Sequence, residues 1–218
     1  MKILVASDFH GNSKAFQKIG SKAKEINADV IAVCGDITQF GTLQQVKNFL
    51  SILASVKLPL YYVLGNTDPL LSAEEVKIEG ATYLHAAYKI HGDTMFLGVG
   101  NTTTRQFYTP EEDIQRILNH IFNSCPKEGR RTVLISHFPP RDTKLDLAYI
   151  GGHVGSLSLR KFIEEKKPAA VFCGHIHESR GIERIGDTIM ANPGPASHGY
   201  YAIANLNRKI EVELCEGA

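Results

Sequence analysis

The chain has 218 residues, 43% of them apolar and 22% charged, with a formal net charge of +1. This composition supports a sizeable core and argues against disorder, and the near-neutral charge provides no basic footprint for a nucleic-acid backbone. No apolar run approaches the roughly 18 residues that a membrane-spanning helix needs. We therefore expect residues 1–218 to form a single domain of a cytoplasmic protein, with neither a membrane nor a nucleic acid as partner.

In the first half of the chain, apolar runs alternate with stretches of helical periodicity. Buried strands are predicted at 2–7, 30–34 and 60–64, and amphipathic helices near 13–26 and 42–55. Strands that alternate with helices in this way indicate βαβ units and parallel sheet.

The second half is richer in strands. The predicted elements are strands at 88–91 and 95–99, a helix that begins near Pro110, a strand at 132–136, a helix at 156–166, and strands at 169–173, 181–185, 188–191, 200–205 and 210–214. The last two strands are joined by a hairpin turn at 207–208. The expected fold class is α/β, with two packed sheets and helices on the outside.

Five of the apolar runs end in side chains that can ligate a metal ion. In chain order these side chains are Asp8, His10, Asp36, Asn66, His137, His175 and His177. Because ligands bind at the carboxyl edge of open α/β sheets, we expect these side chains to gather there. A glycine directly precedes Asp36, Asn66 and His175, where it lets the backbone turn sharply and approach a ligand closely.

Imidazole and oxygen ligands without a thiolate suit a divalent transition metal. Seven such ligands are too many for one tetrahedral ion, and they match two ions that share a bridging carboxylate. Two ions about 3.5–4 Å apart can bind a phosphate and activate water near neutral pH. The pattern therefore predicts a two-metal site suited to phosphate chemistry.

The ordered blocks Asp-x-His, Gly-Asp, Gly-Asn-x-Asp, a lone His after a strand and Gly-His-x-His resemble those of the calcineurin-like metallophosphoesterases. The resemblance runs from Asp8 to His177, and the turn Asn192-Pro193-Gly194 extends it. It implies a four-layer α/β/β/α sandwich of two mixed sheets flanked by helices, in agreement with the elements predicted above.

The resemblance also implies how the ligands are shared between two ions. One ion would be held by Asp8, His10, Asp36 and His177, and Asp36 would bridge to a second ion held by Asn66, His137 and His175. The candidate ions are Mn, Fe, Zn and Ni, with Mn favoured. The implied reaction is in-line attack of a metal-bridging hydroxide on a small phosphorus ester, with Asn66 at the catalytic centre.

One block departs from the family pattern. Its usual form is Gly-Asn-His-Asp/Glu, whose His steadies the transition state or protonates the leaving oxygen, and Thr67 stands at that position here. Positioned acid catalysis contributes about 10²–10⁴ in rate, and a hydroxyl cannot supply an imidazolium. Either the substrate has a leaving group that needs little protonation, or His153 in the glycine-rich segment 151–156 takes over as the catalytic acid. The simpler alternative is that His153 is an ordinary loop residue.

Other polar residues near the metal blocks are candidate substrate contacts. They are Asn12, Thr67, Arg105, Arg141 and Arg180. An arginine can hold phosphate oxygens in a bidentate fork. For Asn12 the favoured role is instead to cap the helix that follows it, and for Thr67 an ordinary turn. Asp68 is expected to brace its loop through backbone N–H groups and not to act as an acid.

Two functions remain open at this point. A metal-dependent phosphoesterase is favoured, with a slight preference for phosphodiesters, because a monoester with a poor alkoxide leaving group gains most from the missing acid. The alternative is a catalytically weak or inactive protein of the same fold that acts as a protein-binding scaffold, although all seven ligands are retained. A nuclease shares the metal chemistry, and a homodimer is the default expectation for so small an enzyme. The sequence names neither the substrate nor the metal.

Overall fold

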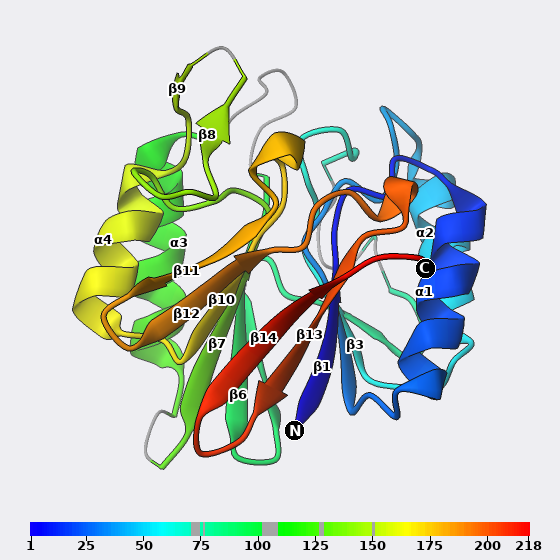
Figure 1. The fold of residues 1–218 in the computed structure, drawn as a ribbon, viewed down its shortest axis with the longest axis horizontal. Coiled ribbons are helices and arrows are strands. Elements are labelled where there is room, and N and C mark those ends of the chain that lie inside the picture. Colours follow the sequence, from blue (N-terminus) through cyan, green and yellow to red (C-terminus); the bar gives the residue numbers. More distant parts are fainter. Residues whose placement is uncertain (71–74, 76, 102–108, 127–128, 150) are drawn as a thin grey trace.

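The computed structural model of the chain describes residues 1–70, 75, 77–101, 109–126, 129–149 and 151–218. Two six-stranded sheets lie face to face, and helices cover the outer side of each (Figure 1). This is the four-layer α/β/β/α arrangement that the sequence predicts. None of the described helices is both long enough and apolar enough to cross a bilayer.

The first sheet has the strand order β14-β13-β1-β2-β3-β4. Its strands are β1 (Lys2–Ala6), β2 (Val30–Val33), β3 (Leu60–Tyr62), β4 (Ala81–Tyr83), β13 (Tyr201–Leu206) and β14 (Ile210–Cys215). β1 to β4 run parallel, and β13 and β14 form the predicted antiparallel hairpin at the other side. Helices α1 (Ser13–Glu25) and α2 (Leu43–Ala54) cover the outer face (Figure 1).

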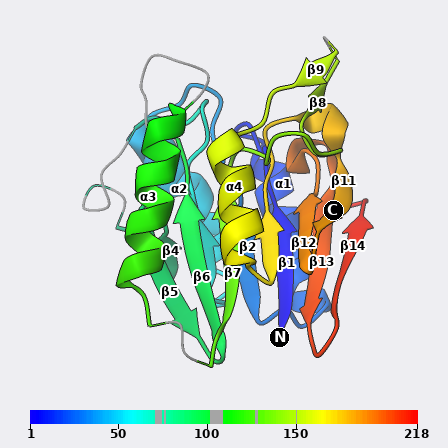
Figure 2. The same cartoon turned by 90° about the vertical axis from the view of Figure 1, so that its left-hand side faces the viewer.

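The second sheet has the strand order β11-β12-β10-β7-β6-β5. Its strands are β5 (Ala87–His91), β6 (Thr94–Val99), β7 (Arg131–Ser136), β10 (Ala170–Phe172), β11 (Gly181–Ile185) and β12 (Thr188–Asn192). The four inner strands are parallel, and the two edge strands are antiparallel to them. Helices α3 (Glu111–Ser124) and α4 (Leu157–Lys166) cover the outer face, which faces the viewer in Figure 2.

The inner strands are buried on both sides, which explains why they read as unbroken apolar runs. In β1, Ile3 and Val5 belong to the core between the sheets, whereas Leu4 and Ala6 pack toward α1 and α2. The helices bury their periodic apolar faces in the same way, with residues such as Ile114 and Leu118 of α3 packed on the second sheet. The inner strands β1, β2 and β10 therefore offer no place for polar side chains except at their ends.

Four short elements are not predicted from the sequence. They are β4, a two-stranded hairpin of β8 (Leu147–Ala148) and β9 (Gly152–His153), and the 3-10 turns η1 (His177–Ser179) and η2 (Ala196–His198). Each strand or turn among them is two or three residues long, which is too short to show a periodic apolar pattern. The β8–β9 hairpin rises above the edge of the sheets at which β1 and β7 end (Figure 1).

The start of α4 is held by a carboxylate from α3. Glu111 accepts hydrogen bonds from the backbone N–H of Leu157 at 3.2 Å and of Ser158 at 2.6 Å, and from the hydroxyl of Ser156 at 3.0 Å. The first N–H groups of a helix have no partner within the helix, and a negative charge there also complements the helix dipole. Glu111 therefore anchors the point at which the segment that carries the hairpin enters α4.

We expect Glu111→Ala to lower the free energy of unfolding by about 1–2 kcal/mol, because the first turn of α4 loses a charged acceptor. Denaturant unfolding followed by circular dichroism measures this difference. Glu112→Ala is the matched control, since Glu112 is exposed on the same turn of α3. Equal unfolding free energies for the two variants would contradict the capping role.

Candidate metal centre

The seven predicted ligands come together where β1, β2 and β3 of the first sheet and β7 and β10 of the second end. Four of them adopt the left-handed backbone region, with φ of 57° at Asp8, 47° at His10, 50° at Asp36 and 72° at His175. This conformation is unusual for residues other than glycine and typically costs about 1–3 kcal/mol, so the surrounding structure must enforce it. The chain thus turns sharply at the ligands themselves and aims them at a common point.

The first group of ligands is Asp8, His10 and His177. The Nε2 atoms of the two imidazoles lie 3.1 Å apart, and Nε2 of His177 lies 3.4 Å from Oδ1 of Asp8. Ligand atoms of all three residues lie within 4.8 Å of one another. This spacing suits a single ion bound by two imidazoles and a carboxylate.

Asp36 lies between this group and the next. Its Oδ2 is 3.9 Å from Nε2 of His10, and its Oδ1 is 3.5 Å from Nε2 of His137. One carboxylate therefore presents one oxygen to each of two sets of ligands. Ligand atoms of Asp8, Asp36 and His137 form a second group within 4.8 Å of one another.

Asn66 and His175 complete the side of the site that faces the second sheet. The Oδ1 of Asn66 is 2.8 Å from Nε2 of His137, and the rings of His137 and His175 lie edge to face with centroids 4.9 Å apart. The Nδ1 of His137 lies 2.8 Å from the carbonyl oxygen of Cys34. Because a carbonyl only accepts, Nδ1 carries a proton, so Nε2, which faces Oδ1 of Asn66, is the nitrogen that a metal would bind.

Burial sets the protonation of two histidines. Burial lowers the pKa of His10, and burial together with the neighbouring His137 lowers the pKa of His175 to about 3. Both rings are therefore neutral near pH 7 and can offer a lone pair. His177 differs, because its hydrogen bond to Asp8 raises its pKa. A metal would displace that proton, so binding at this group weakens as the pH falls.

The pKa values of the two carboxylates, Asp36 and Asp8, are shifted in opposite directions. Burial and the charge of Asp8 raise the pKa of Asp36. Burial also acts to raise the pKa of Asp8, but the hydrogen bond with His177 and the charges of His137 and His177 outweigh it and lower this pKa to about 2. Two buried carboxylates side by side repel each other, and a divalent cation between them would remove that repulsion. The donor set and its charge thus fit divalent transition ions.

Asp68 braces the loop that presents Asn66, as predicted. Its two oxygens accept from the backbone N–H groups of Ile37 at 3.0 Å, Thr38 at 2.7 Å and Gly65 at 3.0 Å. Burial and the nearby charge of Asp36 raise the pKa of Asp68 to about 6. The contacts join the loop after β2 to the loop after β3 and so fix Asp36 relative to Asn66.

Two of the candidate substrate contacts, Asn12 and Thr67, already have hydrogen-bond partners within the protein. Asn12 caps α1 by accepting from the N–H of Ala15 at 3.3 Å, and its amide donates to the carbonyl of Ser197 at 3.2 Å. The hydroxyl of Thr67 donates to the carbonyl of Thr38 at 2.7 Å, and its N–H donates to Asp36 at 2.9 Å.

The candidate arginines that the structure describes, Arg180 and Arg141, differ in how their side chains are held. Arg180 donates to the carbonyls of Pro193 at 3.0 Å and Cys215 at 3.1 Å and lies 4.6 Å from the ring centre of Tyr200. Arg141 has a side chain that is 46% exposed, in the segment that follows His137. Arg105 lies outside the described residues.

His153 lies in β9, with its Nδ1 2.7 Å from Oδ1 of the buried Asp146. Sequence reasoning missed Asp146. In the sequence, Asp146 is only an acid seven residues before His153, the candidate proton donor, in the same loop. That spacing is a weak signal without knowledge of the fold. It also missed the bracing role of Asn192, whose amide donates to the carbonyl of Ile176 at 2.8 Å between two ligands.

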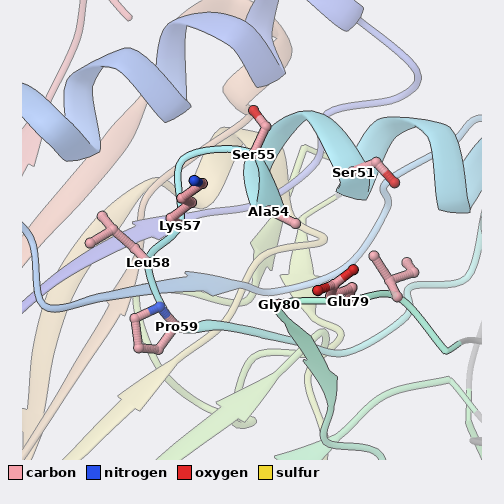
Figure 3. Close-up of a pocket in the computed structure, with 9 residues that line it drawn as sticks. Ser51, Ala54, Ser55, Lys57, Leu58, Pro59, Glu79 and Gly80 are labelled. Carbon is pink, nitrogen blue, oxygen red and sulfur yellow. The ribbon is translucent and has the colours of Figure 1, made fainter.

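A cavity of about 710 Å³ lies away from this site, between the end of α2, the start of β3 and Gly80 (Figure 3). Pro59, which lines it, directly precedes β3, whereas Asn66 follows the other end of that strand. The cavity therefore opens at the opposite edge of the sheet and contains none of the predicted ligands.

The comparison with known sequences agrees with this geometry. The family model of the calcineurin-like phosphoesterase superfamily domain matches residues 1–208. An uncharacterised protein of Methanocaldococcus jannaschii, MJ1162, is 35% identical over 207 residues, which cover 92% of this chain and 91% of the relative. The chain belongs to the calcineurin-like phosphoesterase superfamily, and the resemblance found in its sequence motifs is confirmed.

Solved structures show the same fold. The protein TT1561 of Thermus thermophilus matches with a TM-score of 0.79 and 20% identity, over 99% of this chain and 98% of that chain. A dimetal phosphatase from Danio rerio matches with a TM-score of 0.68 and 11% identity, over the same shares of the two chains. An archaeal phosphodiesterase matches with a TM-score of 0.54 and 16% identity, over 99% of both chains. At these identities the likeness concerns the fold, and it confirms the predicted fold class.

We expect Gly65→Ala to weaken Mn²⁺ binding by about 10-fold or more, since disturbing the groups that orient metal ligands costs about that much in affinity. A Cβ at Gly65 would lie 2.5 Å from the backbone N of Asp36 and 2.7 Å from Cε1 of His137, so both ligands must shift. Isothermal titration calorimetry measures the affinity, and circular dichroism checks the fold. Gly152→Ala is the control, because nothing lies within 4 Å of its Cβ position. Unchanged Mn²⁺ affinity in Gly65→Ala would show that these two residues are not ligands.

Proposed function

We propose that this protein is a metal-dependent phosphoesterase with a dinuclear centre, and that residues 1–218 form its single catalytic domain. The observation that carries the proposal is the position of Asp36, whose two oxygens face His10 on one side and His137 on the other. A carboxylate in that position is suited to bridge two ions. The burial of Asp36 supports the same role, because two neighbouring buried carboxylates, Asp36 and Asp8, would repel each other without cations between them.

The ligands divide as the sequence resemblance implies. Asp8, His10 and His177 would hold one divalent ion with Asp36, and Asn66, His137 and His175 would hold the other with Asp36, Mn²⁺ being the favoured ion. Two divalent ions held there activate water for attack on phosphorus and neutralise charge on the phosphoryl oxygens. The protein's own contribution is to fix the positions of the ligands. The left-handed backbone at Asp8, His10 and Asp36 orients these three side chains.

The leaving oxygen also needs a proton when it is basic, and we assign this step to His153. The attacking water bonds its oxygen to phosphorus and loses a proton to solvent. The P–O bond to the leaving group breaks with its electron pair on the leaving oxygen, and the His153 imidazolium gives its Nε2 proton to that oxygen. The ring regains a proton from solvent. Thr67 cannot do this, because its hydroxyl already donates to the carbonyl of Thr38.

Among the candidate substrate contacts, Arg141 fits a phosphate contact best, since its side chain is 46% exposed and its described ion pair, with Asp142, spans 3.9 Å. Asn12, Thr67 and Arg180 have donors engaged by backbone carbonyls, so we assign them to holding the site's walls. A phosphodiester remains the favoured substrate. The phosphatase from Danio rerio and the archaeal phosphodiesterase show that this fold accommodates both types of chemistry.

A scaffold that binds proteins is the competing function, because the family's usual His is replaced by Thr67. The retained geometry of the ligands favours the enzyme, since a scaffold has no need for strained ligands in the left-handed region. Neither a dimer nor a nucleic-acid partner is part of the proposal.

We expect Asp36→Asn to lower kcat/KM for bis-p-nitrophenyl phosphate with Mn²⁺ by about 10³-fold, because the amide keeps the shape of the side chain and cannot bridge two cations. Initial rates at saturating Mn²⁺ measure the effect. Asp187→Asn, an exposed carboxylate in the β11–β12 turn, is the control and should keep the wild-type rate. Equal rates in wild type and Asp36→Asn would refute the bridging role, and no turnover in the wild type with Mn²⁺, Fe²⁺, Zn²⁺ or Ni²⁺ would favour the scaffold.

We expect His153→Ala to lower kcat/KM about 100-fold for methyl phenyl phosphate and less than about 10-fold for methyl p-nitrophenyl phosphate. The two esters differ only in the leaving group, and phenolate is more basic than p-nitrophenolate and therefore needs the proton more. His120→Ala on α3 is the control, since this imidazole is exposed and far along the chain from every ligand. Equal losses for the two esters in His153→Ala would exclude His153 as the proton donor.

A further inference from the structure

We propose that Asp146 is a positioning residue that holds the imidazole of His153 in the orientation and tautomer needed for proton donation at the metal centre. The inference rests on the proposed function, because it concerns the acid of that same reaction. It adds a residue that neither the metal-ligand pattern nor the family's usual third block indicates.

Asp146 is built into the loop as an acceptor. Its side chain is fully buried, and it accepts from the backbone N–H groups of Asp142 at 3.2 Å, Thr143 at 2.8 Å and Gly155 at 3.0 Å. Burial acts to raise the pKa of Asp146, but the hydrogen bonds from His153 and these N–H groups lower it. The carboxylate is therefore ionised near neutral pH and can only accept.

The carboxylate also accepts from the hydroxyl of Thr143 at 3.3 Å, and its further partner is the side chain of His153. The Nδ1 of the ring lies 2.7 Å from Oδ1 of Asp146, and the side chain of His153 is 39% exposed, whereas that of Asp146 is 0% exposed. Since Asp146 only accepts, Nδ1 of His153 must carry a proton. The other nitrogen, Nε2, is then the one that exchanges a proton with a substrate, as in other carboxylate–histidine pairs.

The segment that carries this pair is tied to the metal ligands at both ends. On one side, it follows His137 directly and closes on itself where the N–H of Ser156 donates to the carbonyl of Pro139 at 2.9 Å. On the other, β9 pairs with β8 so that His153 lies opposite Leu147, and the hydroxyl of Ser179 donates to the carbonyl of Leu147 at 2.6 Å.

Ser179 belongs to η1, which begins at the ligand His177. A further bond joins the same two elements, since the N–H of Tyr149 donates to Glu178 at 2.8 Å. Figure 1 shows the β8–β9 hairpin above the carboxyl edge of the second sheet and beside η1. The segment that carries His153 is thus tied to the two loops that begin at the candidate ligands His137 and His177.

The alternative interpretation is that Asp146 only stabilises its loop through the backbone N–H groups. The two interpretations differ in how the reaction rate of an Asp146 variant depends on the leaving group. A loop-stabilising residue affects all substrates alike, whereas a residue that acts through His153 matters only when the leaving group needs a proton.

The first test measures kcat/KM of Asp146→Asn for the two methyl aryl phosphates with Mn²⁺. We expect a loss of about 10–100-fold for methyl phenyl phosphate and a smaller loss for methyl p-nitrophenyl phosphate. In the His153→Ala background, Asp146→Asn should cause no additional loss for either ester. Equal losses for both esters, or full additivity with His153→Ala, would overturn the proposal. Asp187→Asn is the matched control for the loss of a carboxylate.

The second test does not depend on turnover, and its main result comes from the wild-type protein. A long-range ¹H–¹⁵N correlation spectrum of the wild-type protein reports which nitrogen of a neutral imidazole carries the proton, and the His153 signals are assigned by their absence in His153→Ala. We expect the Nδ1–H tautomer in the wild type, and its loss in Asp146→Asn. An Nε2–H tautomer in the wild type would overturn the proposal. If the tautomer is as expected and no ester is hydrolysed, the proposed function fails, and the role of Asp146 in proton donation fails with it.

Discussion

The hydrogen bond between Nδ1 of His137 and the carbonyl of Cys34 joins the two sheets at the metal centre. It spans 2.8 Å between the end of β7 in the second sheet and the end of β2 in the first, and both residues are fully buried. A second bond crosses in the same place, since the N–H of His175 donates to Asp8. Without these bonds, ligands from two separate sheets would have no fixed distance between them, so the geometry of the site depends on the packing of the whole sandwich.

The same constraint explains why the ligands tolerate strain. Both faces of the inner strands β1, β2, β7 and β10 are covered, so the polar side chains of the site follow the ends of these strands, and the chain must turn at once to bring them together. Asp8, His10, Asp36 and His175 take up the left-handed backbone that this turn requires. Gly65 and Gly174 lie against the side chains of Asp36 and Asp8, where any Cβ would collide. The two glycines therefore let the backbone pass close to the candidate ligands, while the candidate ligands themselves adopt the strained backbone conformation.

The fold could be predicted from the sequence because its signals are strong and local. Unbroken apolar runs such as Val30–Val33 and helices with one apolar face indicated strands alternating with helices, and five of the runs ended in candidate metal ligands. The ligands were predicted as a set because their order along the chain matches the family motif. The φ values of Asp8 and Asp36 were beyond prediction, because they arise from bonds between strands that lie far apart in the sequence.

Short elements and long-range partners were also not predictable. The β8–β9 hairpin consists of two pairs of residues, Leu147–Ala148 and Gly152–His153, with no alternating pattern. In the sequence, Asp146 looks like any other acidic residue in a loop. Only its burial and its contact with His153, both seen in the structure, set it apart. Arg180 looked free as a loop cation, whereas the fold places it between two backbone carbonyls and the ring of Tyr200.

Thr67 shows how the loss of one group can redirect a site. Its N–H donates to Asp36 and its hydroxyl to the carbonyl of Thr38, so this position serves to fix the carboxylate that we propose as the bridge. A proton donor can therefore no longer come from the first sheet at this loop. The segment between β7 and α4 belongs to the second sheet, and it carries an imidazole whose Nδ1 is already bound by a buried carboxylate. In the proposed reaction the acid would then approach the leaving group from the side of the second sheet, so the loop that carries His153 would take part in selecting which esters fit.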